Sequence, residues 1–190
     1  MAHRLRVVAG SAGGLHLAAP KGARPTTDRA KEALFASLGD LVEGATVLDL
    51  FAGSGALGIE ALSRGADRAT FVDRDRHAAE AIRTNLATTG FADPARARVV
   101  SQPVTAFLGA TSGVGREWRP YDLLFLDPPY ETAAGALTTL LGRVEEGGWP
   151  APGATVVVEC RATNRPALPS GWQVPSERRY GDTLLLVATV

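Results

Sequence analysis

The sequence predicts an α/β fold in which a mostly parallel sheet is covered by helices on both faces. From residue 45 onward, short apolar runs alternate with helical segments, a pattern typical of repeated strand–helix–strand units. A glycine-rich turn directly follows the first of these runs. The last two strand-like runs follow one another without a helix between them. They therefore predict an antiparallel hairpin that closes an otherwise parallel sheet.

Each element of the sheet part is predicted from the length and composition of its segment. Runs of four to seven mostly apolar residues are typical of strands that are buried on both faces. We expect such strands at 45–51, 69–73, 97–100, 122–126 and 154–160. Longer segments with helical periodicity separate most of them, and we expect helices at about 56–64, 76–89 and 133–146, with a short one near 103–109. The Gly- and Ser-containing segment 109–120 is predicted to be an exposed loop.

The two ends of the chain differ from this pattern. Runs 172–180 and 183–189 meet at Gly181-Asp182, which predicts the closing hairpin and brings the strand count to seven. At the other end, runs 5–9 and 15–18 flank a glycine-rich turn and predict a loose hairpin. A helix is expected to follow, capped by Thr26, Thr27 or Asp28 and reaching residue 41 with Leu34, Leu38 and Leu41 on one face. We therefore divide the chain into an extension, 1–43, and a sheet domain, 44–190.

Length and composition restrict the possible classes of protein. The chain has 190 residues, of which 45% are hydrophobic and 21% charged, as expected of one globular domain with a small appendage. No apolar run approaches the roughly 20 residues of a membrane helix, and the N-terminus lacks a secretory signal pattern. The lone cysteine, Cys160, is expected to be a core residue of a cytoplasmic protein. With one cysteine and three histidines, no metal site is expected.

Charge is distributed unevenly along the chain although the formal net charge is zero. Residues 1–31 carry six basic side chains and one acid, a balance of +5, and the remaining 14 basic and 19 acidic residues give −5. The basic residues of the extension are Arg4, Arg6, Lys21, Arg24, Arg29 and Lys31. This asymmetry favours contact between the extension and a polyanion such as a nucleic acid. A solvated basic arm without a partner is the alternative.

The glycine-rich turn predicts a nucleoside-binding loop. It contains Gly53, Gly55 and Gly58, which match the spacing G-x-G-x-x-G after a strand and before a helix. Asp73 ends the next strand, where a carboxylate can bind ribose hydroxyls. Asp49 lies four residues before the loop and would repel a pyrophosphate but attract an ammonium or sulfonium group. S-adenosylmethionine is therefore preferred to NAD, although an NAD-dependent oxidoreductase remains an alternative.

The segment Asp127-Pro128-Pro129-Tyr130, here called the substrate ledge, predicts the second half of the site. It follows a buried run and offers a carboxylate, a backbone carbonyl and an aromatic ring. These groups suit a planar substrate with an NH2 group, such as a nucleobase or an amide, although Asp and Pro also end strands for purely structural reasons. Because ligands of such sheets bind beyond the carboxyl ends of the strands, the ledge and the glycine loop are expected to share one pocket.

These motifs resemble the class I S-adenosylmethionine-dependent methyltransferases, which have a Rossmann-like fold. Residues 49–55 resemble their first motif, and 127–130 the fourth motif of the enzymes that methylate amines. The chain is most similar to the RsmD family, which methylates the N2 amine of a guanine in 16S rRNA. That resemblance covers nearly the whole chain and includes residues 6–10, 24–29, 47–65 and 180–183. The block 24–29 is the most discriminating, since the other motifs occur in many methyltransferases.

The resemblance implies roles for individual residues. Cofactor contacts would come from Asp49, Phe51, Gly53, Ser54, Gly55, Asp73, Arg74 and Gln102. The chain departs from the family in having Pro103 where a polar residue would meet the adenine, so Gln102 or the backbone N–H of Val104 would make that contact. RNA contacts would come from Arg4, Arg6, Lys21, Arg24, Thr26 and Arg29. The implied substrate is a guanine on an assembled or assembling 30S subunit, and we expect a monomer without an obligate protein partner.

The expected chemistry is methyl transfer to an exocyclic amine that Asp127 and the Pro128 carbonyl bind. Pro129 would keep the ledge rigid, and Tyr130 would stack on a base removed from its helix. N6 of adenine in DNA is an alternative target, although about 70 residues between the two motifs leave little room for a DNA-recognition region. A protein-amide methyltransferase and a catalytically silent RNA-binding factor are further alternatives.

Overall fold

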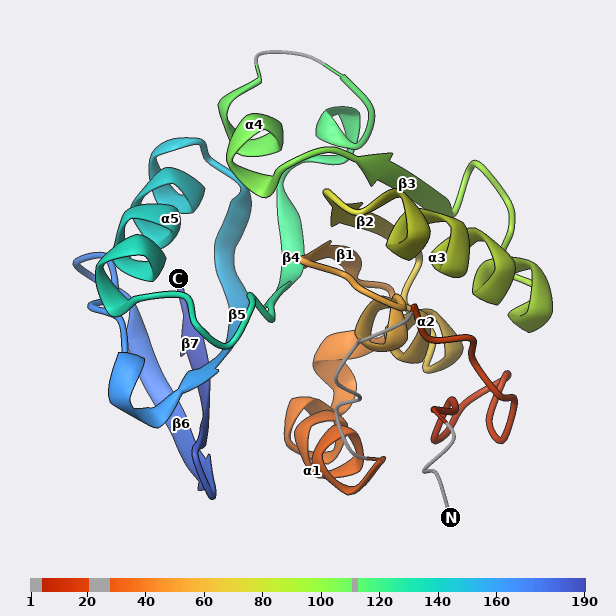
Figure 1. The fold of residues 1–190 in the computed structure, drawn as a ribbon, viewed down its shortest axis with the longest axis horizontal. Coiled ribbons are helices and arrows are strands. Elements are labelled where there is room, and N and C mark those ends of the chain that lie inside the picture. The colour runs from red at the N-terminus through yellow and green to blue at the C-terminus, as the bar shows by residue number, and fades with distance from the viewer. Residues whose placement is uncertain (1–4, 21–27, 111–112) are drawn as a thin grey trace.

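The computed structural model describes residues 5–20, 28–110 and 113–190, and these form a three-layer α/β structure (Figure 1). Seven strands make one sheet in the order β3-β2-β1-β4-β5-β7-β6. The first five strands of that order run parallel, β7 is antiparallel to β5, and β6 is antiparallel to β7. The predicted mixed sheet is therefore confirmed. The strands are β1 (Thr46–Leu50), β2 (Arg68–Asp73), β3 (Ala97–Ser101), β4 (Tyr121–Leu126), β5 (Pro150–Arg161), β6 (Gln173–Tyr180) and β7 (Thr183–Thr189).

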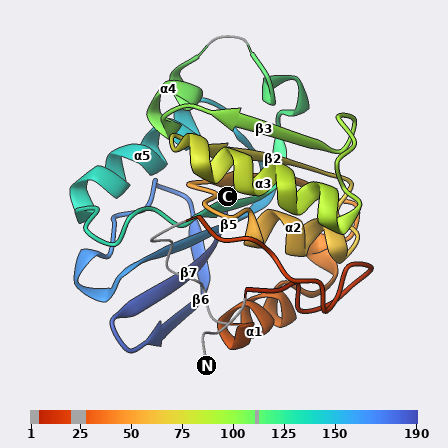
Figure 2. The ribbon, with the colours of Figure 1, turned by 45° about the vertical axis from the view of Figure 1, so that its right-hand side comes forward.

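Helices cover the two faces of the sheet, as Figures 1 and 2 show. On one face the core contains side chains of α1 (Asp28–Leu38), α2 (Ala56–Ser63) and α3 (Arg76–Thr89). On the other face it contains side chains of α4 (Val104–Gly109) and α5 (Ala134–Glu146). The described residues also form three short 3-10 helices: η1 (Gly39–Val42), η2 (Arg116–Trp118) and η3 (Ala162–Asn164). None of the helices in the described residues is both long enough and apolar enough to cross a membrane.

The N-terminal hairpin is present but is shorter than predicted. An isolated antiparallel bridge joins Arg6 and His16. Backbone hydrogen bonds from Val7 N to Leu15 O and from Leu17 N to Leu5 O, each 2.9 Å long, flank the bridge. Residues 5–17 and α1 share one hydrophobic cluster with the sheet and α2, so the extension packs on the sheet domain as part of its core. The division at residue 43 stays a prediction.

The predicted apolar face of the first helix is wrong at its end. Leu34 and Leu38 are buried as expected, but Leu41 is 58% exposed. The α-helix stops at Leu38, where Gly39 takes a φ of 53°, and the chain tightens into η1. The change of period turns Leu41 outward and buries Val42 in its place. Thr26 and Thr27, two of the expected capping residues, lie outside the described residues.

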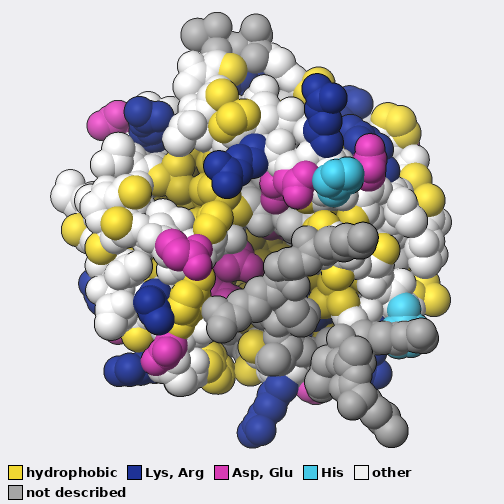
Figure 3. Space-filling view, viewed as in Figure 1, with side chains coloured by type: hydrophobic (Ala, Val, Ile, Leu, Met, Phe, Trp, Pro, Cys, Tyr) yellow, Lys and Arg dark blue, Asp and Glu magenta, His cyan; other side chains and the backbone are white. Residues whose placement is uncertain are grey.

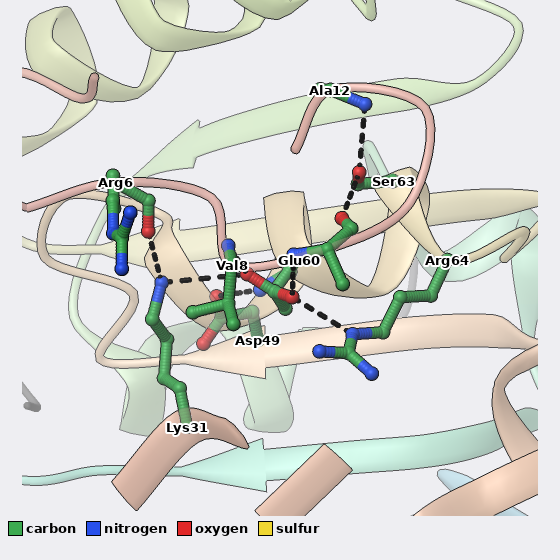
Figure 4. A network of polar contacts seen from close by, with 10 residues as sticks. Arg6, Val8, Ala12, Lys31, Asp49, Glu60, Ser63 and Arg64 are labelled. Carbon is green, nitrogen blue, oxygen red and sulfur yellow. Dashed lines mark hydrogen bonds and ion pairs between the residues drawn. The ribbon is translucent and has the colours of Figure 1, made fainter. Parts of the chain in front are cut away.

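A buried acid on α2 fastens the extension to the sheet domain (Figure 4). The carboxylate of Glu60 accepts hydrogen bonds from Val8 N at 2.7 Å and from Ala9 N at 3.0 Å. It also meets Arg64 Nε at 2.8 Å and Lys31 Nζ at 3.5 Å. The Lys31 side chain is fully buried, so its inclusion among the residues that favour a polyanion is wrong. Its ammonium neutralises Glu60 and donates to the carbonyl of Arg6.

One loop and the start of one strand also depart from expectation. In segment 109–120, of which the structure describes 109–110 and 113–120, Gly115 is buried and its carbonyl accepts from the hydroxyl of Tyr121. The 3-10 helix η2 follows. The guanidinium groups of Arg116 and Arg119 cover the ring of the buried Trp149 at 4.5 and 5.0 Å. This loop is therefore packed, with partial exposure. Strand β5 begins at Pro150, four residues earlier than predicted. On the same strand, Cys160 is a buried free thiol, as expected.

Candidate active site

Four carboxylates lie in a row along the C-terminal edge of the parallel strands. Asp73 ends β2, Asp49 lies on β1, Asp127 follows β4 and Glu159 lies on β5. These strands are consecutive neighbours in the sheet, in the order β2-β1-β4-β5. The edge is therefore negatively charged wherever these acids are ionised, and it suits ligands that bring positive charge or hydrogen-bond donors.

The glycine loop turns sharply between β1 and α2. Phe51 has a φ of 62°, a left-handed conformation that is unusual for a residue with a side chain, and Gly53 and Gly55 have φ of 56° and 76°. The loop is held by Asp73, whose Oδ2 accepts a 2.8 Å hydrogen bond from Gly53 N while its Oδ1 accepts from Asp75 N at 2.9 Å. Each oxygen of Asp73 retains acceptor capacity, since an ionised carboxylate offers about four lone-pair sites.

Asp49 supports the loop from below. Its side chain is only 2% exposed, and its Oδ2 accepts a 3.0 Å hydrogen bond from Gly58 N in the first turn of α2. At Gly58 a Cβ atom would come within 2.4 Å of the Phe71 ring, so only glycine lets α2 approach the sheet this closely. Burial raises the pKa of Asp49 to about 8, against a lowering by the Gly58 hydrogen bond and a further rise from the charge of Asp73.

One side chain connects the glycine loop to the N-terminal extension. The amide of Asn85 on α3, which is 1% exposed, donates to Ser54 O and to Ala18 O at 2.9 Å each. Its Oδ1 accepts from Ala18 N at 2.7 Å. All three hydrogen bonds involve backbone groups of the partners, so Asn85 fixes the main chain of the loop and of the extension relative to one another.

The substrate ledge is braced from its C-terminal side. Thr132 N donates to Pro129 O at 2.8 Å, and the amide of Asn164 donates to Thr132 O at 3.0 Å. Pro128 is buried, whereas Asp127 and Tyr130 are half-buried. The guanidinium of Arg161 lies over the Tyr130 ring, 4.7 Å from its centroid. The stacked arginine and the turn together restrict the orientation of the ring.

Asp127 has an unusual protonation equilibrium. Burial is the first cause that raises its pKa well above the usual range, followed by the negative charges of Glu159 and then Asp49. All three causes disfavour the ionised carboxylate, so hydrogen-bond donors or a cation brought into the site would favour ionisation again. A strongly shifted carboxyl group in a pocket is a typical feature of functional sites.

The glycine loop and the ledge open into one cavity of about 1490 Å³. In Figure 3 its walls carry hydrophobic side chains, and acidic side chains lie within it. All four ledge residues line it, together with Phe51, Gly53, Asp73 and Arg74. Four of the predicted cofactor contacts do not line it: Asp49, Ser54, Gly55 and Gln102. Asp49 supports the loop by accepting from Gly58 N, the Ser54 carbonyl accepts from Asn85, and Gly55 packs against the core. Pro103, Val104 and Thr105 do line it, so Val104 N is better placed than Gln102 for an adenine contact.

Several residues that line the cavity were not predicted from the sequence. Glu159 lines the cavity, and its signal was a single acid within an otherwise apolar strand. Arg161 lies two residues farther along and gave no signal of its own. Ala30 and Leu34 of α1 and Tyr180 and Thr183 at the tip of the final hairpin also line the cavity. Their position depends on how the two ends of the chain pack against the sheet, which a local pattern does not encode.

The predicted RNA-contact residues fall into two groups. Arg6 and Arg29 belong to the described residues and are exposed. Arg4, Lys21, Arg24 and Thr26 lie outside the described residues. Within the described ranges, no group of three or more His, Cys, Asp or Glu side chains is arranged to hold a metal ion.

Comparisons with known proteins agree with this arrangement. A family model described as "Conserved hypothetical protein 95" matches residues 5–189. The chain is 37% identical over 181 residues to ribosomal RNA small subunit methyltransferase D of Escherichia coli K12, covering 94% of this chain and 86% of that protein.

Solved structures show the same fold. A putative methyltransferase from Escherichia coli has a TM-score of 0.84 and 35% identity, with 98% of this chain and 97% of that chain covered. An RNA methyltransferase from Salinibacter ruber, solved with S-adenosyl-L-homocysteine, has a TM-score of 0.64 and 16% identity over 88% of this chain and 94% of that one. The chain therefore has the Rossmann-like class I methyltransferase fold and belongs to the RsmD family.

Proposed function

We propose that this chain transfers a methyl group from S-adenosylmethionine to the exocyclic N2 amine of a guanine in 16S rRNA. The observation that carries the proposal is that the glycine loop and the substrate ledge line one cavity. A relative with 37% identity is named as a small-subunit rRNA methyltransferase, which supports rRNA as the substrate class. The implied partner is an assembled or assembling 30S subunit, on which the protein acts as a monomer.

The residues of the glycine loop fit S-adenosylmethionine. At Gly53 a Cβ would meet the Phe51 carbonyl oxygen at 3.9 Å and no other atom more closely, so a ligand can approach this backbone. Asp73 has acceptor capacity left for ribose hydroxyls, Arg74 lies at the exposed rim, and Val104 N begins a helix, where it has no intrahelical partner. The row of carboxylates favours the ammonium and sulfonium of this ligand over the pyrophosphate of NAD. When bound, S-adenosylmethionine supplies a methyl group activated by its positively charged sulfur.

The substrate ledge offers acceptors for the amine of the substrate. The lone pair of a guanine N2 amine is delocalised into the ring, which makes the amine a weak nucleophile. Hydrogen bonds from its two N–H groups to the Asp127 carboxylate and the Pro128 carbonyl would favour a pyramidal nitrogen with an available lone pair. Positive charge develops on that nitrogen during transfer, and Asp127 would stabilise it electrostatically in a partly buried site. Donors on the amine also favour the ionised form of Asp127, whose pKa is raised in their absence.

A guanine reaches this cavity only when it is removed from its stack. Tyr130, oriented by Arg161, would stack on the removed base and contribute roughly 1–3 kcal/mol. Arg6 and Arg29 would meet RNA phosphates from the extension, with Arg4, Lys21, Arg24 and Thr26 as the further predicted contacts.

Two measurements test the proposal. Small subunits that lack the modification are incubated with the protein and methyl-labelled S-adenosylmethionine, and we expect label in the 16S rRNA. RNA binding without label would favour a silent binding factor. In calorimetric titrations, S-adenosylhomocysteine should bind and NAD should not; the opposite result would favour an oxidoreductase.

A further inference from the structure

Glu159 lies beside Asp127 on the neighbouring strand. Leu126 of β4 pairs with Val158 of β5, so Asp127 and Glu159 occupy the next positions of two strands that run about 4.8 Å apart. Phe125 and Val157, two residues earlier on each strand, belong to the same core cluster. Because side chains alternate along a strand, the two carboxyl groups project to that same face, and both line the cavity. Their proximity is independently reflected in the raised pKa of Asp127, to which Glu159 contributes.

The surroundings of Glu159 are suited to a flat ring. Leu185 pairs with Glu159 across β5 and β7 and lines the cavity, as do Ala30 and Leu34 of α1 and Val157. These side chains give this part of the cavity apolar walls, with the two carboxyl groups as acceptors. A planar base between such walls would present one edge to Asp127 and Glu159 together.

The edges of the purine bases differ in what they offer to two adjacent carboxylates. Guanine carries N1–H next to its N2 amine, so one edge presents neighbouring donors. Adenine has an N1 lone pair beside its N6 amine, and a carboxylate facing that lone pair would be repelled. We propose that Glu159 accepts a hydrogen bond from N1–H of the guanine whose N2 amine is bound by Asp127, and thereby selects guanine over adenine-like bases. This assignment rests on the proposed function.

The test compares two target bases that both carry an N2 amine. Small subunits are reconstituted with 16S rRNA that holds either guanosine or 2,6-diaminopurine riboside at the methylated position. The analogue keeps the amine but has a lone pair at N1. For the wild-type protein, we expect kcat/KM to favour guanosine at least about tenfold, as for a well-formed specific base contact. Glu159→Gln should reduce that preference about tenfold or more, because its amide can donate to N1 of the analogue.

Two further variants make the result specific. Glu159→Asp keeps a carboxylate and should keep the preference for guanosine even if the rate falls. Glu131→Gln removes an exposed acid from the rim of the same cavity and should leave the preference unchanged. The melting temperature and the affinity for S-adenosylhomocysteine, measured for each variant, show that the fold and the cofactor site are intact.

The outcomes separate the assignment from the function on which it rests. If Glu159→Gln and Glu131→Gln both prefer guanosine as strongly as the wild-type protein does, the role of Glu159 is overturned and the proposed function stands. A wild-type preference for the analogue, or loss of the preference in Glu159→Asp, would also overturn that role. Failure of the wild-type protein to methylate either base would overturn the proposed function and the assignment together.

Discussion

The ammonium of Lys31 and the carboxylate of Glu60 lie 3.5 Å apart, and both side chains are completely buried. Lys31 belongs to α1, whereas Glu60 belongs to α2 and also accepts from the main chain at Val8 and Ala9. The pair thus connects three segments: the N-terminal hairpin, α1 and the helix that follows the glycine loop. Removal of the Glu60 carboxylate takes away the acid beside the buried ammonium and the acceptor of the Val8 and Ala9 amides.

We expect Glu60→Ala to lower the free energy of unfolding by about 3–5 kcal/mol, the usual effect of breaking a buried ion pair. Urea denaturation followed by circular dichroism measures it. Glu80→Ala removes an exposed acid that lies 3.7 Å from His77 and should change stability by less than about 0.5 kcal/mol. Equal, small effects of both substitutions would show that the Glu60 network does not stabilise the fold.

Replacement of Asp127 by Asn should abolish most methyl transfer. The variant keeps the shape of the side chain but loses the charge that binds the amine, and we expect kcat to fall about 10²–10³-fold. The affinity for S-adenosylhomocysteine, measured by calorimetry, should change little. Asp122→Asn is a matched control, because Asp122 lies near the opposite end of β4. Within the described residues, the one hydrogen bond found for its carboxylate comes from Thr46 N. Full activity of Asp127→Asn would remove Asp127 from the chemistry.

The pH dependence of kcat/KM should report the environment of Asp127 in the protein without substrate. The ionised carboxylate is the active form, so kcat/KM should fall as the pH is lowered through the raised pKa, well above the ordinary value of 3.8. Glu159→Gln removes a negative charge, which lowers the pKa of Asp127 and moves the acid limb to lower pH. Asp49→Asn should move it less, because Asp49 is the smaller contribution and has its own pKa raised to about 8. An acid limb at the same pH in all three proteins would contradict this explanation.

The exposed Arg29 of α1 is expected to contact RNA phosphates. Arg29→Ala should weaken binding to unmodified small subunits, and the slope of log affinity against log salt concentration should become less steep by about one unit. Filter binding across a salt series measures both. Glu32→Ala removes an exposed acid from the same helix and should not weaken binding. Loss of affinity in both variants with unchanged slopes would indicate a structural effect.

Most of the fold was predictable because parallel strands buried on both faces are continuous apolar runs. Strands β1 to β4 and helices α2 to α5 begin and end within about one residue of their predicted positions. The errors lie where tertiary packing overrides the local pattern. Leu41 fits the apolar period of α1, but the chain changes direction at Gly39 and exposes this side chain. Lys31 was predicted to be a surface cation, but it is buried beside Glu60.

The candidate site was predictable only in part, for a related reason. The glycine loop and the ledge are local motifs after strands, and their meeting follows from the general position of ligands at such sheets. Glu159 becomes significant only once β5 is known to lie beside β4, with Val158 opposite Leu126. Likewise, the hydrogen bond from Gly58 N to the Asp49 carboxylate depends on the close packing of α2 against the sheet, which no local motif indicates. The contact of Asp49 with the cofactor stays a prediction.

Identification of the product nucleoside shows whether the methyl group reaches N2 of a guanine. Unmodified small subunits are incubated with the protein and labelled S-adenosylmethionine, and the 16S rRNA is then digested and separated by chromatography with mass spectrometry. We predict N2-methylguanosine as the labelled nucleoside, at one position of the rRNA. Label in a methylated adenosine, or in ribosomal protein instead of RNA, would rule out N2 of guanine as the methyl acceptor.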